Sequence, residues 1–389
     1  SPPPAGFMQF PQAGARGAYR LRVVHPGDAR FAFRASSDVP PPAVKTTTLG
    51  TEHYFDLRDP ASAIVPEGAP PRFGVTRIVQ FSAYGDWSAV AQFLTPLFTR
   101  AAILSPSSPI KAEAARIAAA TADPIKRAEA ALRLVQEQVR YVYVGLDGGN
   151  YRPASVEETW QRRFGDCKAK TALLVAVLGE LGIAAEPVLV DVNGGDGIDE
   201  RLPTPAVFNH IVVRTTIAGV AYWLDGTRAG DRSLASIEPP RARWVLPLRA
   251  GAVELEALSP VAARRPELVE AVEIDATRGF DQPGNYRVQR TLRTEEIFGM
   301  RAYLAGLVAA DADRTLVAYW RRDWAEIEAT RTSWRFDDAN RLLVLTLEGT
   351  GKVDWEGDAK QGRTHYLIAG GFNPPAELKR PKDQAQDAP

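Results

Sequence analysis

A single cysteine, Cys167, restricts this chain of 389 residues more than any other feature of its sequence. One thiol cannot form a disulfide within the chain, and it cannot build a cysteine-rich zinc or iron–sulfur site. The chain must therefore fold around hydrophobic cores, and its length allows two or three domains that each bury a core of their own. Cys167 itself is either a buried structural residue or a nucleophile.

Charge and hydropathy exclude several classes of partner. The chain carries 47 Lys and Arg against 47 Asp and Glu, so no global field attracts it to nucleic acid, and we expect no nucleic-acid partner. The longest apolar run, near residues 171–179, is far shorter than the roughly 18–20 residues of a membrane span, so no transmembrane helix is predicted. Glycine-rich stretches do not follow a strand and open a helix, so nucleotide binding is not supported.

The pattern of apolar residues divides the chain into three regions. Residues 1–105 read as strands between Pro and Gly clusters, which predicts a β-rich domain, and the lack of an obvious first strand pair suggests part of a larger sandwich. Residues 106–258 combine helical stripes with later strands, which predicts an α+β core. Residues 259–389 begin with a Pro- and Arg-rich linker and continue as a mixed α/β region with β-sandwich character. They end in a polar tail after Pro374.

Cys167 lies at the start of a predicted helix. Asp166 is a good N-cap, apolar residues share one face over residues 173–181, and Gly182 stands where a terminal glycine is expected. Free N–H groups at a helix start favour a thiolate, and the backbone N–H of the cysteine can bind an oxyanion. Lys168 adds positive charge next to it. The alternative is that Cys167 is a small buried apolar residue.

His210 and Asp225 can complete a catalytic site with this cysteine. A cysteine nucleophile needs a histidine, and the histidine needs an Asp or Asn to fix its tautomer. His210 follows Asn209 near the start of a predicted strand, and Asp225 closes the next strand, so antiparallel pairing would place both at one end of a sheet. Taken singly, His210 also fits an ordinary strand histidine, and Asp225 fits an Asp-Gly turn.

The order of these residues resembles the transglutaminase-like superfamily, which shares the papain-like Cys-His-Asp arrangement. The resemblance rests on Arg-Phe-Gly-Asp-Cys-Lys at residues 163–168, Asn-His near a strand start and Trp-Leu-Asp at the end of the next strand. It covers about residues 141–227 and extends more loosely to the flanking β regions, including residues 76–87. It is closest to bacterial multi-domain proteins with flanking β-sandwich domains of unassigned function. It implies an α+β, papain-like core flanked by β-rich sandwich-type regions. Ala169 departs from the pattern, since relatives often carry an acidic residue there.

The resemblance also implies roles for individual residues. Cys167 is the expected nucleophile, His210 the general base and later acid, and Asp225 the residue that orients the imidazole. A second oxyanion donor is expected upstream, although the same positions fit a buried strand. The candidates for oxyanion or substrate contact are Tyr141, Tyr143 and Trp160.

The other histidines do not predict a metal site. His25, His53 and His365 lack the close His, Cys or Asp spacing of a zinc site, so we expect surface or hydrogen-bonded core roles, no metal and no cofactor. Residues 150–153 and 193–197 either border a substrate cleft or are ordinary loops.

These inferences predict a cysteine-dependent enzyme that transfers acyl groups from amide bonds of peptide or protein substrates through an acyl-enzyme on Cys167. Hydrolysis is slightly favoured over transamidation, because water is always present and no site for a second amine is visible. The alternative is a non-catalytic envelope or protein-binding module with an inactive or occluded triad.

The chain begins at Ser1 without Met, so we expect a trimmed product. A lone thiol fits a periplasmic or other extracytoplasmic location. The sequence makes no prediction of oligomeric state.

Overall fold

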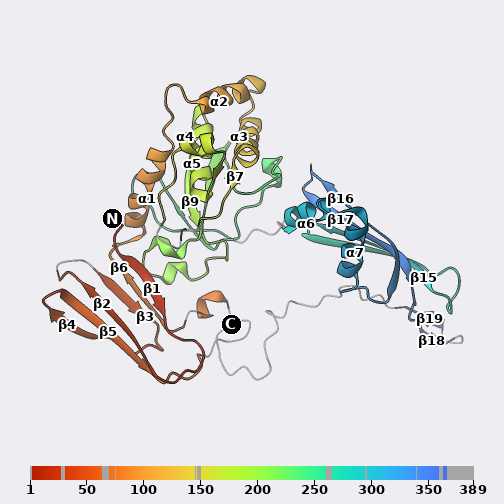
Figure 1. Cartoon of the computed structure of the whole chain (residues 1–389), viewed down its shortest axis with the longest axis horizontal. Coiled ribbons are helices and arrows are strands. Elements are labelled where there is room, and N and C mark those ends of the chain that lie inside the picture. Colours follow the sequence, from red (N-terminus) through yellow and green to blue (C-terminus); the bar gives the residue numbers. More distant parts are fainter. Residues whose placement is uncertain are drawn as a thin grey trace. The chain divides into compact units, whose positions relative to one another are not determined.

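A computed structural model of the chain describes residues 2–27, 31–63, 70–74, 76–144, 146, 150–259, 265–293, 296–338, 340–358 and 362–365. The chain divides into two compact units, one built mainly from Ser1–Arg228 and Ser233–Val261, the other from Ala229–Arg232 and Ala262–Asn373 (Figure 1). The polar tail after Pro374 and residues 260–264 of the predicted linker lie outside the described residues. No helix within the described ranges is long and apolar enough to cross a membrane.

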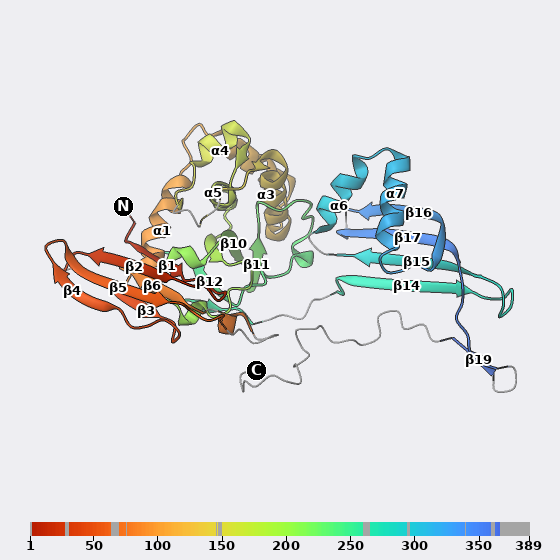
Figure 2. The same cartoon turned by 60° about the horizontal axis from the view of Figure 1, so that its bottom comes forward.

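The first unit begins with a small β-sandwich. Its two three-stranded antiparallel sheets have the orders β1–β6–β3 and β2–β5–β4 (Figure 2). The strands are β1 (Ala5–Gln9), β2 (Ala18–His25), β3 (Ala32–Ala35), β4 (Ala43–Thr47), β5 (Gly50–Arg58) and β6 (Ile78–Ser82). Buried Phe55 of β5 shares a cluster with Val79 of β6, and the Phe33 ring of β3 stacks on His53 of β5 with centroids 3.8 Å apart. Side chains from both sheets therefore fill one shared core.

The rest of the first unit is an α+β core. Its helices are α1 (Trp87–Ala101), α2 (Pro109–Ala120), α3 (Pro124–Gln138), α4 (Val156–Arg162) and α5 (Cys167–Glu180). An antiparallel sheet in the order β11–β10–β9–β12–β13 contains β9 (Ala185–Val190), β10 (His210–Ile217), β11 (Val220–Leu224), β12 (Trp244–Pro247) and β13 (Glu256–Ala257). The short strands β7 (Arg140–Tyr141) and β8 (Phe164–Gly165) pair in parallel. Single turns of 3₁₀-helix are η1 (Pro71–Gly74), η2 (Ile198–Glu200), η3 (Pro205–Val207) and η4 (Leu234–Ser236).

Helix α5 lies at the centre of this core. It contacts α1 to α4 as well as β9 and β10, and Leu173, Leu174 and Leu178 are fully buried. A helix that is apolar on nearly all sides is stable only where other elements surround it. Each of the five helices begins with an Asp or Ser whose side chain accepts a backbone N–H, which fixes its start. The α+β class predicted from the sequence is confirmed.

Helix α1 packs in this core. The expected boundary after residue 105 assigns it to the β-rich region, but its buried Trp87, Val90 and Leu94 share one cluster with Leu173 of α5. An amphipathic stripe shows that a helix buries one face, and it does not show which neighbour covers that face.

The second unit pairs one sheet with two helices. The antiparallel sheet has the order β14–β15–β17–β16, and a separate hairpin follows it. The elements are β14 (Leu268–Asp275), β15 (Gly284–Leu292), α6 (Glu296–Ala305), α7 (Ala309–Trp320), β16 (Ile327–Asp337), β17 (Leu342–Gly351), β18 (Glu356–Asp358) and β19 (Gly362–Thr364). Leu304 of α6 and Leu316 of α7 share a cluster with Val288 and Leu345 of the central strands. In the described part of this unit, helices rather than a second sheet cover the four-stranded sheet, so the expected β-sandwich character is not found there.

Candidate active site

The chain around Cys167 is shaped so that the cysteine is the first residue of α5. Gly165 comes just before the helix, and a Cβ there would lie 3.0 Å from the Cβ of Ala169 and 3.1 Å from Cγ2 of Thr159. A larger residue at this position would force these two side chains to move. Asp166 then caps the helix by accepting the Ala169 N–H at 2.9 Å. The Cys167 N–H thereby belongs to the first turn, whose N–H groups have no partner within the helix.

His210 and Asp225 lie at the same end of two neighbouring strands. β10 begins at His210 and pairs antiparallel with β11, which ends one residue before Asp225. Nε2 of His210 lies 2.8 Å from Oδ2 of Asp225. Oδ1 of Asp225 accepts the Thr227 backbone N–H at 2.8 Å and the Thr227 hydroxyl at 2.7 Å. The carboxylate is therefore held on both oxygens.

The thiol of Cys167 completes this chain of contacts. Its side chain is close enough to the His210 ring to raise the pKa of the imidazole. Since Nε2 of the ring faces Asp225, Nδ1 is the nitrogen left for the sulfur. The structure thus brings the three residues together in the order Cys167, His210, Asp225.

The electrostatic environment of His210, next to Asp225, favours a charged imidazole. Burial alone would lower the pKa of His210, but the hydrogen bond and charge of Asp225, with a smaller contribution from Cys167, raise that pKa to about 10. Burial alone would raise the pKa of Asp225, but the hydrogen bond and charge of His210 and the donors of Thr227 lower it. At neutral pH the pair is therefore an imidazolium and a carboxylate.

Two buried lysines occupy the first turn of α5. Lys168 is 0% exposed, and its Nζ lies 2.5 Å from Oδ2 of Asp166 and donates to the Val144 carbonyl oxygen at 3.1 Å. Lys170 is 1% exposed and donates to the Val139 carbonyl oxygen. Burial lowers the pKa of Lys170 to about 8, although the charge of Asp225 acts in the opposite direction. The two lysines bind the chain segment of residues 139–144 at both of its ends.

Tyr141 lies in the middle of that segment. The N–H of Val142 donates to the Gly165 carbonyl at 3.0 Å, so the segment also pairs with the chain that leads into Cys167. Burial, aided by Cys167 and then Asp225, raises the pKa of Tyr141 to about 12. Its hydroxyl therefore keeps its proton at neutral pH and can donate a hydrogen bond near the sulfur.

The two other candidates for substrate contact lie in different surroundings. Tyr143 is 70% exposed. Trp160 is buried in the hydrophobic core of the unit, with the guanidinium carbon of Arg163 3.8 Å from the centre of one of its rings. Trp160 therefore packs against the interior of the unit.

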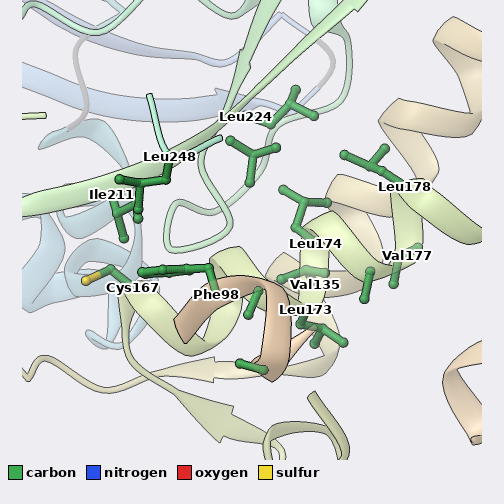
Figure 3. Packing of buried hydrophobic residues seen from close by; sticks show 14 of the residues in the cluster. Phe98, Val135, Cys167, Leu173, Leu174, Val177, Leu178, Ile211, Leu224 and Leu248 are labelled. Atoms are coloured by element: carbon green, nitrogen blue, oxygen red, sulfur yellow. The ribbon is translucent and has the colours of Figure 1, made fainter. Parts of the chain in front are cut away.

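The thiol itself is nearly covered. Cys167 is 2% exposed and belongs to the main apolar cluster. In Figure 3 its sulfur lies at one end of that cluster and points away from Phe98 and from the leucines of α5.

The remaining sequence candidates do not form a metal centre. Among the residues that the structure describes, no group of three or more His, Cys, Asp and Glu side chains is arranged to hold a metal ion. Nε2 of His25 lies 3.3 Å from Nε2 of His53 in the sandwich, and His365 contacts the Asp354 carbonyl in the second unit. Of the two loops, residues 193–197 meet the sandwich, because Asp196 pairs with Arg72 at 2.7 Å.

Sequence reasoning missed Lys170 and Thr227. Lys170 could have been recognised in the sequence as a second charged residue in the first turn of a helix that is otherwise largely apolar. A charged residue in such a buried helix needs a polar partner. Thr227 carries a weaker signal, since a threonine two residues after an aspartate commonly closes a local turn.

Comparison with known proteins finds a solved structure with a similar fold. No protein-family model and no curated protein matches the chain. Among solved structures, a candidate protease from Parabacteroides distasonis matches over 89% of this chain and 69% of its own, with a TM-score of 0.50 and 12% identity. A candidate cysteine protease from Cytophaga hutchinsonii matches over 57% and 70% with a TM-score of 0.26 and 12% identity. The transglutaminase of red sea bream matches over 75% and 68% with a TM-score of 0.23 and 10% identity. The last two scores are too low to carry an argument, and the first shows a shared fold alone.

Proposed function

We propose that this protein is a transglutaminase-like thiol enzyme that acts on amide bonds of peptides or proteins through an acyl-enzyme on Cys167. The observation that carries the proposal is the contact of 2.8 Å between His210 and Asp225, beside a cysteine that raises the pKa of the same imidazole. A nucleophile, a proton carrier and an orienting carboxylate in contact are the parts that acyl transfer requires. The fold shared with a candidate protease is consistent with this activity.

The proposed reaction has two halves. The Cys167 thiolate attacks the amide carbonyl, and the resulting oxyanion is bound by the Cys167 backbone N–H and the Tyr141 hydroxyl. His210, already protonated, gives its proton to the leaving amine as the C–N bond breaks, which leaves a thioester on the sulfur. A water molecule or a second amine then attacks the thioester, His210 takes its proton, and the thiolate is released with a carboxylic acid or a new amide.

Hydrolysis is the favoured second half. Water is always at hand, whereas transamidation needs a bound amine, and no feature of the sequence or the site supplies one. An extracytoplasmic location is part of the same proposal, because a lone thiol has no second cysteine within the chain to trap it in a disulfide.

Peptide-library profiling by mass spectrometry tests the proposal. The intact protein should cleave a subset of peptides, each product pair together gaining one water, and Cys167→Ala should abolish cleavage while it leaves the fold unchanged. Adding a primary amine in excess separates the two outcomes, since transamidation would join the amine to the acyl fragment. Equal product profiles for the wild type and Cys167→Ala would overturn the proposal.

The 2% exposure of Cys167 favours a second candidate, a binding module whose triad is covered. Alkylation by iodoacetamide distinguishes the two, because the chain holds one cysteine and the reagent therefore reports on one site. Labelling of the native protein at pH 6 faster than of a free thiol supports the enzyme. Labelling only after unfolding supports the covered module.

A further inference from the structure

A crevice of about 300 Å³ lies where the β-sandwich meets the loop that carries η2. Its walls come from β3, β6, η1 and η2, and they include Arg34, Gln80 and Arg201 together with apolar Ile78. This volume is at the lower end of the range for small-molecule sites.

Arg201 brings a positive charge to this crevice without a carboxylate beside it. Its side chain is half-buried, and within the described chain no Asp or Glu forms an ion pair with it. Its guanidinium lies over the ring of Phe7 at 5.4 Å from the centroid, and the charge of Asp191 reaches it only at longer range. A guanidinium taken partly out of water usually has an anionic partner.

Gln80 adds a neutral donor at the same place. The residue is 7% exposed, and its Oε1 accepts the Leu202 N–H at 3.0 Å, which fixes the orientation of the amide. Nε2 is then the free end, and none of the described residues accepts a hydrogen bond from it. A side-chain amide buried to this extent normally uses its donors.

Arg34 supplies a second guanidinium, and the acids of the crevice are already engaged. Arg34 donates to the main-chain oxygen of Glu200 and forms no ion pair among the described residues. The Glu200 carboxylate and Asp196 are both held by Arg72, at 2.8 Å and 2.7 Å. The unused groups of the crevice are therefore donors, and two of them are charged.

We propose that this crevice binds an oxyanion, a carboxylate or a phosphate, between Arg201, Arg34 and Gln80. Planar guanidinium groups bind such anions through paired N–H donors. The apolar surfaces of Ile78 and Phe7 next to these donors favour a carboxylate on an organic body, such as an acidic amino acid or peptide, over free phosphate. The site is independent of acyl transfer at Cys167, so its test does not depend on catalysis.

Titration calorimetry on the full chain carrying Cys167→Ala tests this site with three probes: N-acetylglutamate, the uncharged diamide N-acetylglutaminamide, and inorganic phosphate. One saturable site for an anion, weakened by added salt, is expected. Tighter binding of N-acetylglutamate assigns the site to carboxylates, and tighter binding of phosphate assigns it to phosphate. No binding of either anion, or equal binding of N-acetylglutaminamide, overturns the proposal.

Variants locate the site. Arg201→Gln should weaken anion binding about tenfold or more, as expected for loss of one charge-assisted contact. Arg34→Gln changes an exposed side chain that cannot unfold the protein, and it should also weaken binding. Arg20→Gln, which removes an exposed arginine elsewhere on the sandwich, is the matched control and should bind as the parent does. Unchanged affinity in Arg34→Gln and Arg201→Gln would place the anion elsewhere and refute the assignment.

Discussion

Replacing Asp225 by Asn should neutralise His210 at physiological pH. The amide keeps the size of the carboxylate but loses its charge, while the burial of the ring is unchanged. In the wild type the pKa of His210 is raised from 6.5 to about 10, which corresponds to about 5 kcal/mol in favour of the imidazolium. Without the Asp225 charge, burial, which lowers the pKa of His210, is opposed only by the smaller contribution of Cys167, and the pKa should fall to about 6.5 or below. At pH 7.5 the charged fraction then drops from nearly all to about a tenth or less.

The same change has a defined effect on stability. A histidine whose pKa is higher in the folded than in the unfolded state stabilises the fold fully below pH 6.5, and this stabilisation is lost as the pH rises toward 10. The free energy of unfolding of the wild type should therefore fall by about 1.5 kcal/mol between pH 6.5 and 8 from this group alone. Asp225→Asn should lack this decrease. Lys170 acts with the opposite sign, mainly above about pH 8, and offsets only about 0.4 kcal/mol of this decrease between pH 6.5 and 8.

Two assays that need no substrate measure these effects. NMR titration of the four histidines gives the pKa of His210 directly, and urea unfolding at several pH values gives the stability. The rate of alkylation of Cys167 at pH 7.5 should fall about tenfold or more in Asp225→Asn, in step with the charged fraction of His210. Asp191→Asn is the matched control, because it removes a carboxylate that binds Asn209 at 2.6 Å but not the His210 ring. A His210 pKa below 7 in the wild type, or the same pKa in Asp225→Asn, would refute the argument.

Three further substitutions test the surroundings of the thiol. Lys170→Met should raise the free energy of unfolding at pH 7 by about 2 kcal/mol, because it removes a buried charge. The gain should shrink above pH 8 and disappear above about pH 10.5, where the wild-type lysine is neutral in both the folded and the unfolded protein. Equal or lower stability of Lys170→Met at pH 7 would contradict this reasoning. Asp166→Ala should cost about 3–5 kcal/mol, since it leaves buried Lys168 unpaired, whereas Asp123→Ala, which removes only the exposed cap of α3, should cost about 1 kcal/mol. Tyr141→Phe should lower kcat for a cleaved peptide about 10²-fold with little change in KM if its hydroxyl binds the oxyanion. A change confined to KM would assign the tyrosine to substrate binding instead.

The three central residues could be found from the sequence because each depends on a local pattern. A capped helix start at Cys167 and two strand ends at His210 and Asp225 are short-range features, and their order along the chain suggested that they meet. The fold class could be predicted for the same reason, since periodic apolar residues report helices and strands directly.

The failures concern packing between distant elements. The stripe on α1 does not reveal that α5 covers it, and the strands of the second unit do not reveal that α6 and α7 form the opposing layer. Lys170 was missed because its partner is a main-chain oxygen, that of Val139, which has no signature in the sequence. The donors of the crevice beside Arg201 come from the sandwich and from the loop that carries η2. These segments are far apart in the sequence, so the sequence does not show that they meet.

Among the described residues, all but one of the buried charges around the first turn of α5 have a partner of opposite charge. Lys168 pairs with Asp166, and His210 pairs with Asp225. Lys170 is the fifth charge, and among the described residues its ammonium hydrogen-bonds a main-chain oxygen and no carboxylate. An interior of low dielectric penalises a buried charge that has no partner of opposite sign, and burial accordingly lowers the pKa of Lys170 to about 8. On this reasoning the helix keeps Lys168 and Lys170 because their ammonium groups bind the main-chain oxygens of Val144 and Val139. These bonds hold the segment of residues 139–144 beside the chain that leads into Cys167.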